Sequence, residues 1–383
     1  MNNKNQMIRT FSIVTVLLLL DLLPVRGQGQ AEEFTVATLN VDGLPEEVGQ
    51  FTVNPGGPCE KYTPEIADYL LEKDFDIVGL QENFNFYDLL FGKLEANYHH
   101  DDCGGKIMEE NFVIPYPFDG ISLIWHHGIE GARTDSTCWA QACGLLGNAN
   151  DELASKGFRR YDLRLKGGAE VVVYNGHWDA TDDEDEVYGY DWPDRETRLV
   201  QWRQLRDSLL AHLDHRPVIV LGDMNSYFAR DSVKQYFIDA IEATGRATVG
   251  DAWIMLERQG EYPSMIERTV PIDDEFYVDW GREGETLDKI LFVNPTGGGR
   301  LTPLSYSIDK EGYRRSDDPT VTLGDHEPIV VHFRIEPAAG SGIWNGRAET
   351  PADGYYDLTG KRLNERPTRK GLYIHRGQKY VVK

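Results

Sequence analysis

Six short apolar runs, mostly of β-branched residues, recur along the chain, and each predicts a strand. In one-letter code they are FTVATL, DIVGL, VVVY, VIVL, ILFV and IVVHF, beginning at Phe34, Asp76, Val171, Val218, Ile290 and Ile329. Such runs are typical of strands that are covered on both faces. We therefore expect them to lie inside a sheet.

Two helices are expected between these strands. Thr63 followed by Pro64 predicts an N-cap and a first-turn proline for a helix that ends near Glu72. Residues 194–213 carry leucines and a tryptophan at helical spacing and predict a longer amphipathic helix. Strands that alternate with helices and are followed by further strands predict an α/β fold, with two packed sheets and helices outside.

Polar segments stand at the ends of the predicted strands. They are Thr38-Leu39-Asn40, Leu80-Gln81-Glu82, Gly176-His177-Trp178-Asp179, Gly222-Asp223-Met224-Asn225, Leu287-Asp288-Lys289-Ile290 and Gly324-Asp325-His326. Taken alone, Gly-Asp-x-Asn is compatible with a simple turn, and His177 with a core histidine. As an ordered set they favour a site, because polar groups near a core pair with each other, a metal or a substrate. Carboxylates, amides and two histidines together indicate phosphoryl transfer with a hard cation.

This ordered set resembles the endonuclease/exonuclease/phosphatase superfamily, which has the DNase I-like fold, over about residues 33–335. Within it the chain is most similar to the bacterial neutral sphingomyelinase branch. The closer resemblance rests on segments 80–90 and 119–124, on Cys143-Gly144, on Lys156-Gly157-Phe158, and on Arg195-Glu196-Thr197-Arg198 with Gln201. It implies a four-layer αββα sandwich as the catalytic domain, which we place at residues 31–336.

The resemblance also implies the roles of the site residues. The expected catalytic set is His177, Asp223, Asn225, Asp288 and His326. The expected set for Mg²⁺, or another divalent cation, is Asn40, Glu82 and Asp325. His326 is expected to act as general base and Asp288 to orient it. His177 would donate to the developing negative charge, while Asp223 and Asn225 hold the nucleophile and the phosphoryl oxygens.

The expected substrate is a phosphate ester, with a phospholipid head group such as that of sphingomyelin favoured. A secreted nuclease on the same fold is the alternative, and a non-catalytic surface-binding module is less favoured. The net charge of −24 disfavours DNA. Two departures bear on the lipid substrate: residues 294–323 contain Tyr306 and Tyr313 where the branch has an aromatic-tipped hairpin, and Trp178 replaces a smaller aliphatic residue.

The first 30 residues predict export. Lys4 and Arg9 precede an apolar stretch from Phe11 to Leu20, and small residues follow, as in a signal peptide. The mature chain is therefore expected to be secreted or held at the cell surface, without a transmembrane segment.

Four cysteines also fit an exported chain, and they allow three disulfide connectivities. We expect Cys138 to pair with Cys143, which are close in sequence, and Cys59 with Cys103. Buried free thiols are the alternative, and a zinc site is less favoured because no histidine follows at finger spacing.

The C-terminal part differs in composition from the rest. A Pro-Ala-Ala-Gly-Ser-Gly linker lies within residues 337–345, and residues 346–383 carry nine Lys/Arg against four Asp/Glu. Short apolar runs around glycines predict a small β-rich module. It resembles the sorting modules of the bacterial type IX secretion pathway, which implies secretion machinery as a partner. A purely structural appendage is an equal alternative.

Overall fold

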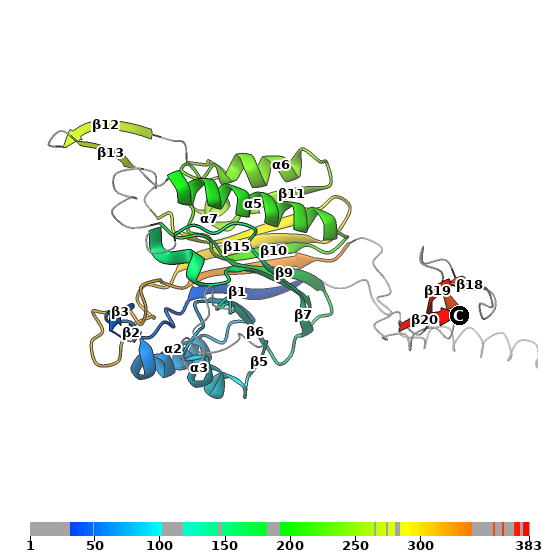
Figure 1. Cartoon of the computed structure of the whole chain (residues 1–383), viewed down its shortest axis with the longest axis horizontal. Coiled ribbons are helices and arrows are strands. Elements are labelled where there is room, and N and C mark those ends of the chain that lie inside the picture. The colour runs from blue at the N-terminus through cyan, green and yellow to red at the C-terminus, as the bar shows by residue number, and fades with distance from the viewer. Residues whose placement is uncertain are drawn as a thin grey trace, which may run out of the picture. The chain divides into compact units, whose positions relative to one another are not determined.

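The computed structural model describes residues 31–48, 50–101, 118–144, 148–181, 192–263, 266–272, 275–279 and 284–338, and short strands between 355 and 382. Residues 28–339 form one compact unit (Figure 1). The predicted signal peptide, Cys103 and most of the predicted linker lie outside the described residues.

Two six-stranded sheets form the centre of this unit. The first has the order β15 (Arg300–Ile308), β16 (Ile329–Glu336), β1 (Glu32–Asn40), β4 (Ile77–Gln81), β6 (Ser122–His126), β5 (Tyr98–His100). The second has the order β11 (Ala247–Asp251), β14 (Asp288–Pro295), β10 (Val218–Asp223), β9 (Glu170–His177), β8 (Gly157–Arg164), β7 (Glu130–Cys138). All six apolar runs are strands, as predicted.

Helices cover the outer face of each sheet (Figure 1). The first sheet is covered by α2 (Cys59–Lys73) and α3 (Tyr87–Leu94). The second is covered by α5 (Trp192–His212), η2 (Lys234–Asp239), α6 (Ala240–Glu242) and α7 (Ala252–Leu256). Short elements complete the unit: η1 (Asn148–Leu153), the pair β2 (Glu47–Val48) and β3 (Phe51–Thr52), and the pair β12 (Ile266–Ile272) and β13 (Glu275–Asp279).

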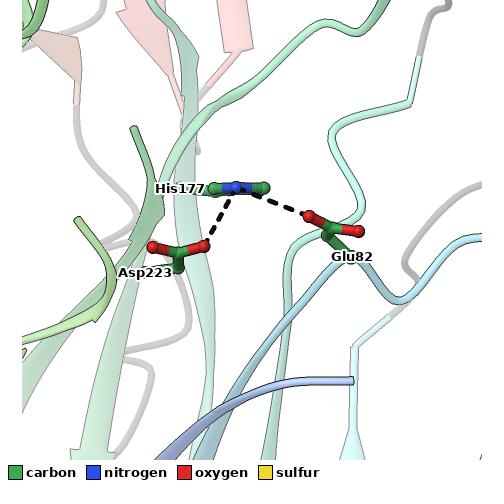
Figure 2. A group of neighbouring side chains, drawn as sticks. All are labelled: Glu82, His177 and Asp223. Atoms are coloured by element: carbon green, nitrogen blue, oxygen red, sulfur yellow. Dashed lines mark ion pairs between the residues drawn. The ribbon is translucent and has the colours of Figure 1, made fainter. Parts of the chain in front are cut away.

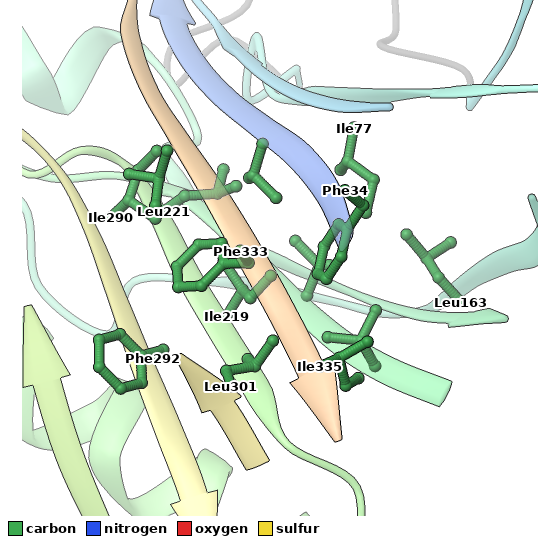
Figure 3. Close-up of a cluster of buried hydrophobic side chains, with 14 of the residues drawn as sticks. Phe34, Ile77, Leu163, Ile219, Leu221, Ile290, Phe292, Leu301, Phe333 and Ile335 are labelled. Carbon is green, nitrogen blue, oxygen red and sulfur yellow. The ribbon is translucent and has the colours of Figure 1, made fainter. Parts of the chain in front are cut away.

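The alternation of side chains within each strand supplies separate hydrophobic layers. In β10, Ile219 and Leu221 pack between the sheets, while Val218 and Val220 face the helices of the second sheet. Figure 3 shows the inter-sheet layer, in which Ile219 and Phe333 come from different sheets. The predicted αββα sandwich is confirmed.

The first predicted helix begins earlier than expected. It starts at Cys59, so Pro64 lies inside it. The Thr63 hydroxyl donates to the Cys59 carbonyl at 2.6 Å and does not cap a backbone N–H. The prediction of Thr63 as N-cap is therefore wrong, and α2 tolerates a proline that removes one intrahelical donor. The second helix, α5, matches its predicted range closely.

The predicted Cys138–Cys143 disulfide is not formed, and Cys59 and Cys138 are free cysteines. The loop after β7 is held by other contacts. Gln204 of α5 receives the Ala140 N–H at 2.7 Å and donates to the Cys138 carbonyl at 2.9 Å. The Cys143 N–H donates to Asp179 at 2.9 Å, which directs this end of the loop toward the strand end after β9.

The C-terminal part contains a separate small sheet. Its order is β18 (Arg362–Leu363), β17 (Tyr355–Tyr356), β19 (Gly371–His375), β20 (Gln378–Val382). The short strands expected after residue 346 are thus present. Within the described residues, no helix combines the length and apolar character that a bilayer crossing needs.

Candidate active site

Strand register brings the predicted site residues to one edge of the sandwich. In the second sheet, β9 and β10 are parallel with His177 opposite Asp223, and β14 is antiparallel with Asp288 opposite Asp223. In the first sheet, parallel β1 and β4 place Asn40 opposite Gln81, directly before Glu82. Residues far apart in sequence therefore meet because their strands end together.

A buried polar bridge joins the two sheets beneath this edge. The Gln81 side-chain amide donates to Asn175 Oδ1 at 2.6 Å, and Asn175 Nδ2 donates to the carbonyls of Leu80 and Ser122 at 3.1 and 2.7 Å. The sheets approach closely at Gly79, where a Cβ atom would lie 2.0 Å from Leu221 Cδ1. The bridge fixes how the ends of β1 and β4 face those of β9 and β10.

Glu82, His177 and Asp223 form the centre of the site (Figure 2). His177 Nε2 lies 3.3 Å from Asp223 Oδ2 and 3.9 Å from Glu82 Oε1. His177 and Asp223 are each 1% exposed, whereas the Glu82 side chain is 22% exposed. Glu82 is thus the member of the group that opens most to solvent.

Asn40 links the two acidic residues of this centre. Its Nδ2 donates to Glu82 Oε1 at 3.0 Å and to Asp223 Oδ2 at 3.1 Å, while its Oδ1 accepts the Asp42 N–H at 3.0 Å. The amide therefore turns its nitrogen toward the carboxylates. A metal-binding role for Asn40 stays a prediction.

His326 and Asp288 form a second, adjoining pair. His326 Nδ1 lies 2.6 Å from Asp288 Oδ2, and His326 Nε2 lies 3.8 Å from Asp223 Oδ2. Burial lowers the pKa of His326, but the Asp288 and Asp223 carboxylates outweigh it and hold that pKa well above its usual range. For Asp223, burial raises the pKa, but the charge of His326, the hydrogen bond from His177 and the charge of Lys156 together outweigh burial and lower it.

The Gly-Asp-x-Asn motif is a strained strand end. Asn225 has φ 44° and donates its backbone N–H to Asp223 Oδ1 at 3.1 Å. Its Nδ2 donates to the Trp178 carbonyl at 3.2 Å, which ties the motif to the strand end after His177. Gly222 has φ +143°, and a Cβ there would lie 2.0 Å from the Gly176 carbonyl oxygen. Only glycine fits before Asp223.

Replacing Gly222 by Ala is expected to lower the free energy of unfolding by about 2 kcal/mol or more, because the added carbon meets backbone in a disfavoured conformation. Gly245→Ala is the matched control: its φ is +68° and nothing lies within 4 Å of the added carbon. Urea unfolding followed by tryptophan fluorescence measures both. Equal effects of the two substitutions would contradict the close approach of β9 and β10.

Two further charged residues lie at the site and were not predicted. Asp42 is 7% exposed, and burial, followed by the charges of Asp325 and Glu82, raises its pKa to about 7. Lys156 ion-pairs with Asp151, and its Nζ donates to the Trp178 carbonyl at 3.5 Å. Burial lowers the pKa of Lys156, and the carboxylates of Asp151, Glu82 and Asp223 more than reverse this.

The structure brings six predicted residues into one connected group: Asn40, Glu82, His177, Asp223, Asp288 and His326. Asp325 is exposed beside His326. Asn225 supports the turn through backbone and amide contacts. The sequence did contain a signal for Asp42, which follows Asn40 by two residues, but a polar residue in a loop does not by itself reveal burial.

The donor set fits a hard divalent cation. Glu82 and Asp223 offer carboxylate oxygens that lie within 4.8 Å of each other and of a His177 nitrogen. The charges of Asp325 and Glu82 also raise the pKa of Asp42. Oxygen ligands of this kind suit Mg²⁺, which keeps several waters and takes few protein ligands. Glu82 combines charge with solvent access and would be the main ligand.

Comparison with known proteins gives a consistent result. No family model matches the chain. It is 24% identical over 302 residues to the sphingomyelinases of Mycobacterium bovis and Mycobacterium tuberculosis, covering 79% of this chain and 52% of theirs. The chain thus spans about half the length of these curated relatives.

Comparison with solved structures finds one with a similar fold and a second, weaker match. D. rerio TDP2, solved in complex with a single-strand DNA product, matches with a TM-score of 0.51 and 14% identity over 79% of this chain and 99% of that one. An endonuclease/exonuclease/phosphatase from Bacteroides vulgatus matches with a TM-score of 0.48 and 16% identity, covering 79% and 98%. The likeness to the TDP2 structure concerns the fold.

Proposed function

We propose that this chain, a member of the endonuclease/exonuclease/phosphatase superfamily, is a secreted, metal-dependent phosphodiesterase that acts on a phospholipid head group such as that of sphingomyelin. One observation carries the catalytic part. Two imidazoles, His177 and His326, approach the same oxygen of Asp223, at 3.3 and 3.8 Å.

This arrangement suits in-line attack of water on a phosphoryl group. Such a reaction needs a group that accepts the proton of water, and it needs hydrogen-bond donors or positive charge at the phosphoryl oxygens. Asp288 accepts the Nδ1–H of His326 and so leaves Nε2 to take the proton. His177, on the other side of Asp223, donates to the charge that develops on the phosphoryl group. A divalent cation bound at Glu82 would supply positive charge to the phosphoryl oxygens and oppose protonation of His326.

The preference for a lipid rests on the sphingomyelinase relatives and on charge. The net charge of −24 repels a polyanion at long range.

The aromatic side chains that differ from the sphingomyelinase branch lie inside the protein. Tyr313 is fully buried, and Tyr306 is partly buried and packs against the core. Residues 294–323 therefore present neither tyrosine for insertion into a bilayer. Trp178 is also core: it packs against Trp139 and Trp202, with ring centroids 5.0 and 4.8 Å away.

The proposal is tested with a substrate panel in Mg²⁺ and in EDTA: sphingomyelin, other phospholipids, plasmid DNA, RNA and simple phosphate esters. Hydrolysis of a phospholipid that stops in EDTA supports it. Plasmid nicking that is faster than every lipid reaction would show that the protein is a nuclease instead. Secretion is tested by expressing the full chain and looking for it in the culture medium. If the protein stays inside the cells, the proposal that it is secreted is wrong.

Choline-phosphate release from detergent-solubilised sphingomyelin is expected to exceed that from liposomes. The reason is that residues 294–323 offer no exposed aromatic side chain to enter the bilayer, so dispersed lipid reaches the site more readily. Initial rates at matched enzyme, lipid and magnesium measure the ratio. Faster release from liposomes would show that another surface of the chain engages the membrane.

A further inference from the structure

A second cluster of metal-ligating side chains lies behind the strand that carries His177. It consists of Cys143, Asp179 and Asp194, and we call it the Cys143 cluster. One ligand atom from each residue lies within 4.8 Å of the others. Cys143 follows β7, Asp179 follows β9 and Asp194 is in the first turn of α5. Three separate segments of the second half of the sandwich therefore converge there.

Asp179 presents an unused ligand atom to this cluster. The residue is 1% exposed, and its Oδ1 accepts the Cys143 N–H at 2.9 Å. Its Oδ2 is buried and has no hydrogen-bond partner among the described residues. A buried carboxylate oxygen without a partner is costly, and binding a cation removes that cost.

Three buried carboxylates lie around the Cys143 cluster. Asp194 is fully buried, and Asp151 adds a third buried carboxylate, which accepts the Ala180 N–H at 2.7 Å. Lys156 makes its ion pair with Asp151. The carboxylates of Asp179 and Asp194 lie within 4.8 Å of each other, and two like charges this close repel each other strongly in a protein interior.

We propose that Cys143, Asp179 and Asp194 bind a thiophilic divalent cation of the zinc class. A thiolate selects Zn²⁺ over Mg²⁺, and carboxylate oxygens are ordinary zinc ligands. Three protein ligands leave the fourth tetrahedral position to water. The Cys143 cluster shares no residue with the two groups around Asp223, so this cation is distinct from the one proposed at Glu82.

Such a cation would stabilise the backbone around His177. The Asp179 N–H donates to Gln201 Oε1 at 3.0 Å, and Gln201 Nε2 donates to the Gln141 carbonyl at 3.0 Å. The Trp139 indole donates to the His177 carbonyl at 2.6 Å. Binding at the Cys143 cluster would therefore fasten the loop after β7 to the strand end that positions His177, and it would favour the folded state.

Co²⁺ binding to the reduced, metal-free full chain tests the proposal, since cobalt reports thiolate ligation by a charge-transfer band in the near ultraviolet. We expect a band that saturates at a single equivalent, disappears when Zn²⁺ is added and survives excess Mg²⁺. Cys143→Ser should abolish it. Cys138→Ser, which removes the exposed cysteine at the end of β7, and Glu82→Gln should both retain it. Absence of the band in the wild type, or its persistence in Cys143→Ser, would overturn the proposal.

A second measurement needs no variant. Zn²⁺ should slow alkylation of Cys143 in the wild-type chain at least tenfold, while Cys138 reacts at the same rate with and without the metal. Peptide mass spectrometry after timed exposure to iodoacetamide gives both rates in one sample. Equal rates for Cys143 with and without Zn²⁺ would reject the site even if the serine variant fails to fold.

Discussion

Replacing Glu82 by Gln is expected to abolish hydrolysis and to weaken Mg²⁺ binding, while leaving the fold intact. The substitution removes the one negative charge of the centre that is open to solvent, and a hard cation binds an amide oxygen far less well. It keeps the size of the side chain and an oxygen that can accept from Asn40 Nδ2. Steady-state rates and calorimetric Mg²⁺ titration measure the two effects.

Glu33→Gln is the control for this experiment. Glu33 lies at the opposite end of β1 and pairs with Arg334 on the surface. It should leave both activity and Mg²⁺ affinity unchanged. Full activity of Glu82→Gln in EDTA would refute Glu82 as the metal centre, and unfolding of that variant, seen by circular dichroism, would point to a structural role instead.

Asp288→Asn is expected to reduce turnover about a hundredfold or more, the scale of a lost general base. The carboxylate fixes His326 Nδ1 at 2.6 Å and helps hold its pKa above the usual range. In the variant the imidazole loses its orientation and its pKa falls. The rise of rate with pH, which follows loss of the His326 proton, should therefore occur at lower pH and reach a lower plateau.

Asp251→Asn is the control for this experiment, because it also removes a buried carboxylate but not one that contacts His326. Asp251 is 2% exposed, and its Oδ1 accepts the Ile254 N–H at 3.0 Å as the N-cap of α7. Asparagine caps a helix equally well, so the variant should keep nearly the wild-type rate. A full rate and an unchanged pH profile in His326→Ala would contradict the assignment of the base.

The strands and the gathering of polar side chains at their ends were predictable because their signals are local. Short β-branched runs such as VIVL are typical of buried strands. Polar residues directly after such a run are easily recognised as candidates for a site. The start of α2 was not predictable from Thr63 and Pro64, because a proline inside the helix is tolerated when Thr63 donates to Cys59. That outcome depends on tertiary packing, which local propensity does not contain.

The residues missed at the site share a different property. Asp42 looks like an ordinary loop residue in sequence, and only its burial beside Glu82 reveals its place at the site. Lys156 belongs to a segment that resembles the sphingomyelinase branch, but that segment does not reveal that its charge acts on Glu82 and Asp223. The cysteine prediction failed for a similar reason. Proximity in sequence favoured Cys138 with Cys143, but the two ends of that loop are held by hydrogen bonds to Gln204 and Asp179 instead.

The strand order has a consequence for synthesis. The first sheet starts with β1, yet its neighbour on one side, β16, is among the last segments of the domain to be made, with Glu32 opposite Ile335. The loop before β16 carries His326, so a nascent chain lacks both its closing strand and His326 until the domain is complete. Pairing between segments so distant folds slowly. The group of side chains around Asp223 is therefore completed only after the last strand of the domain has been made.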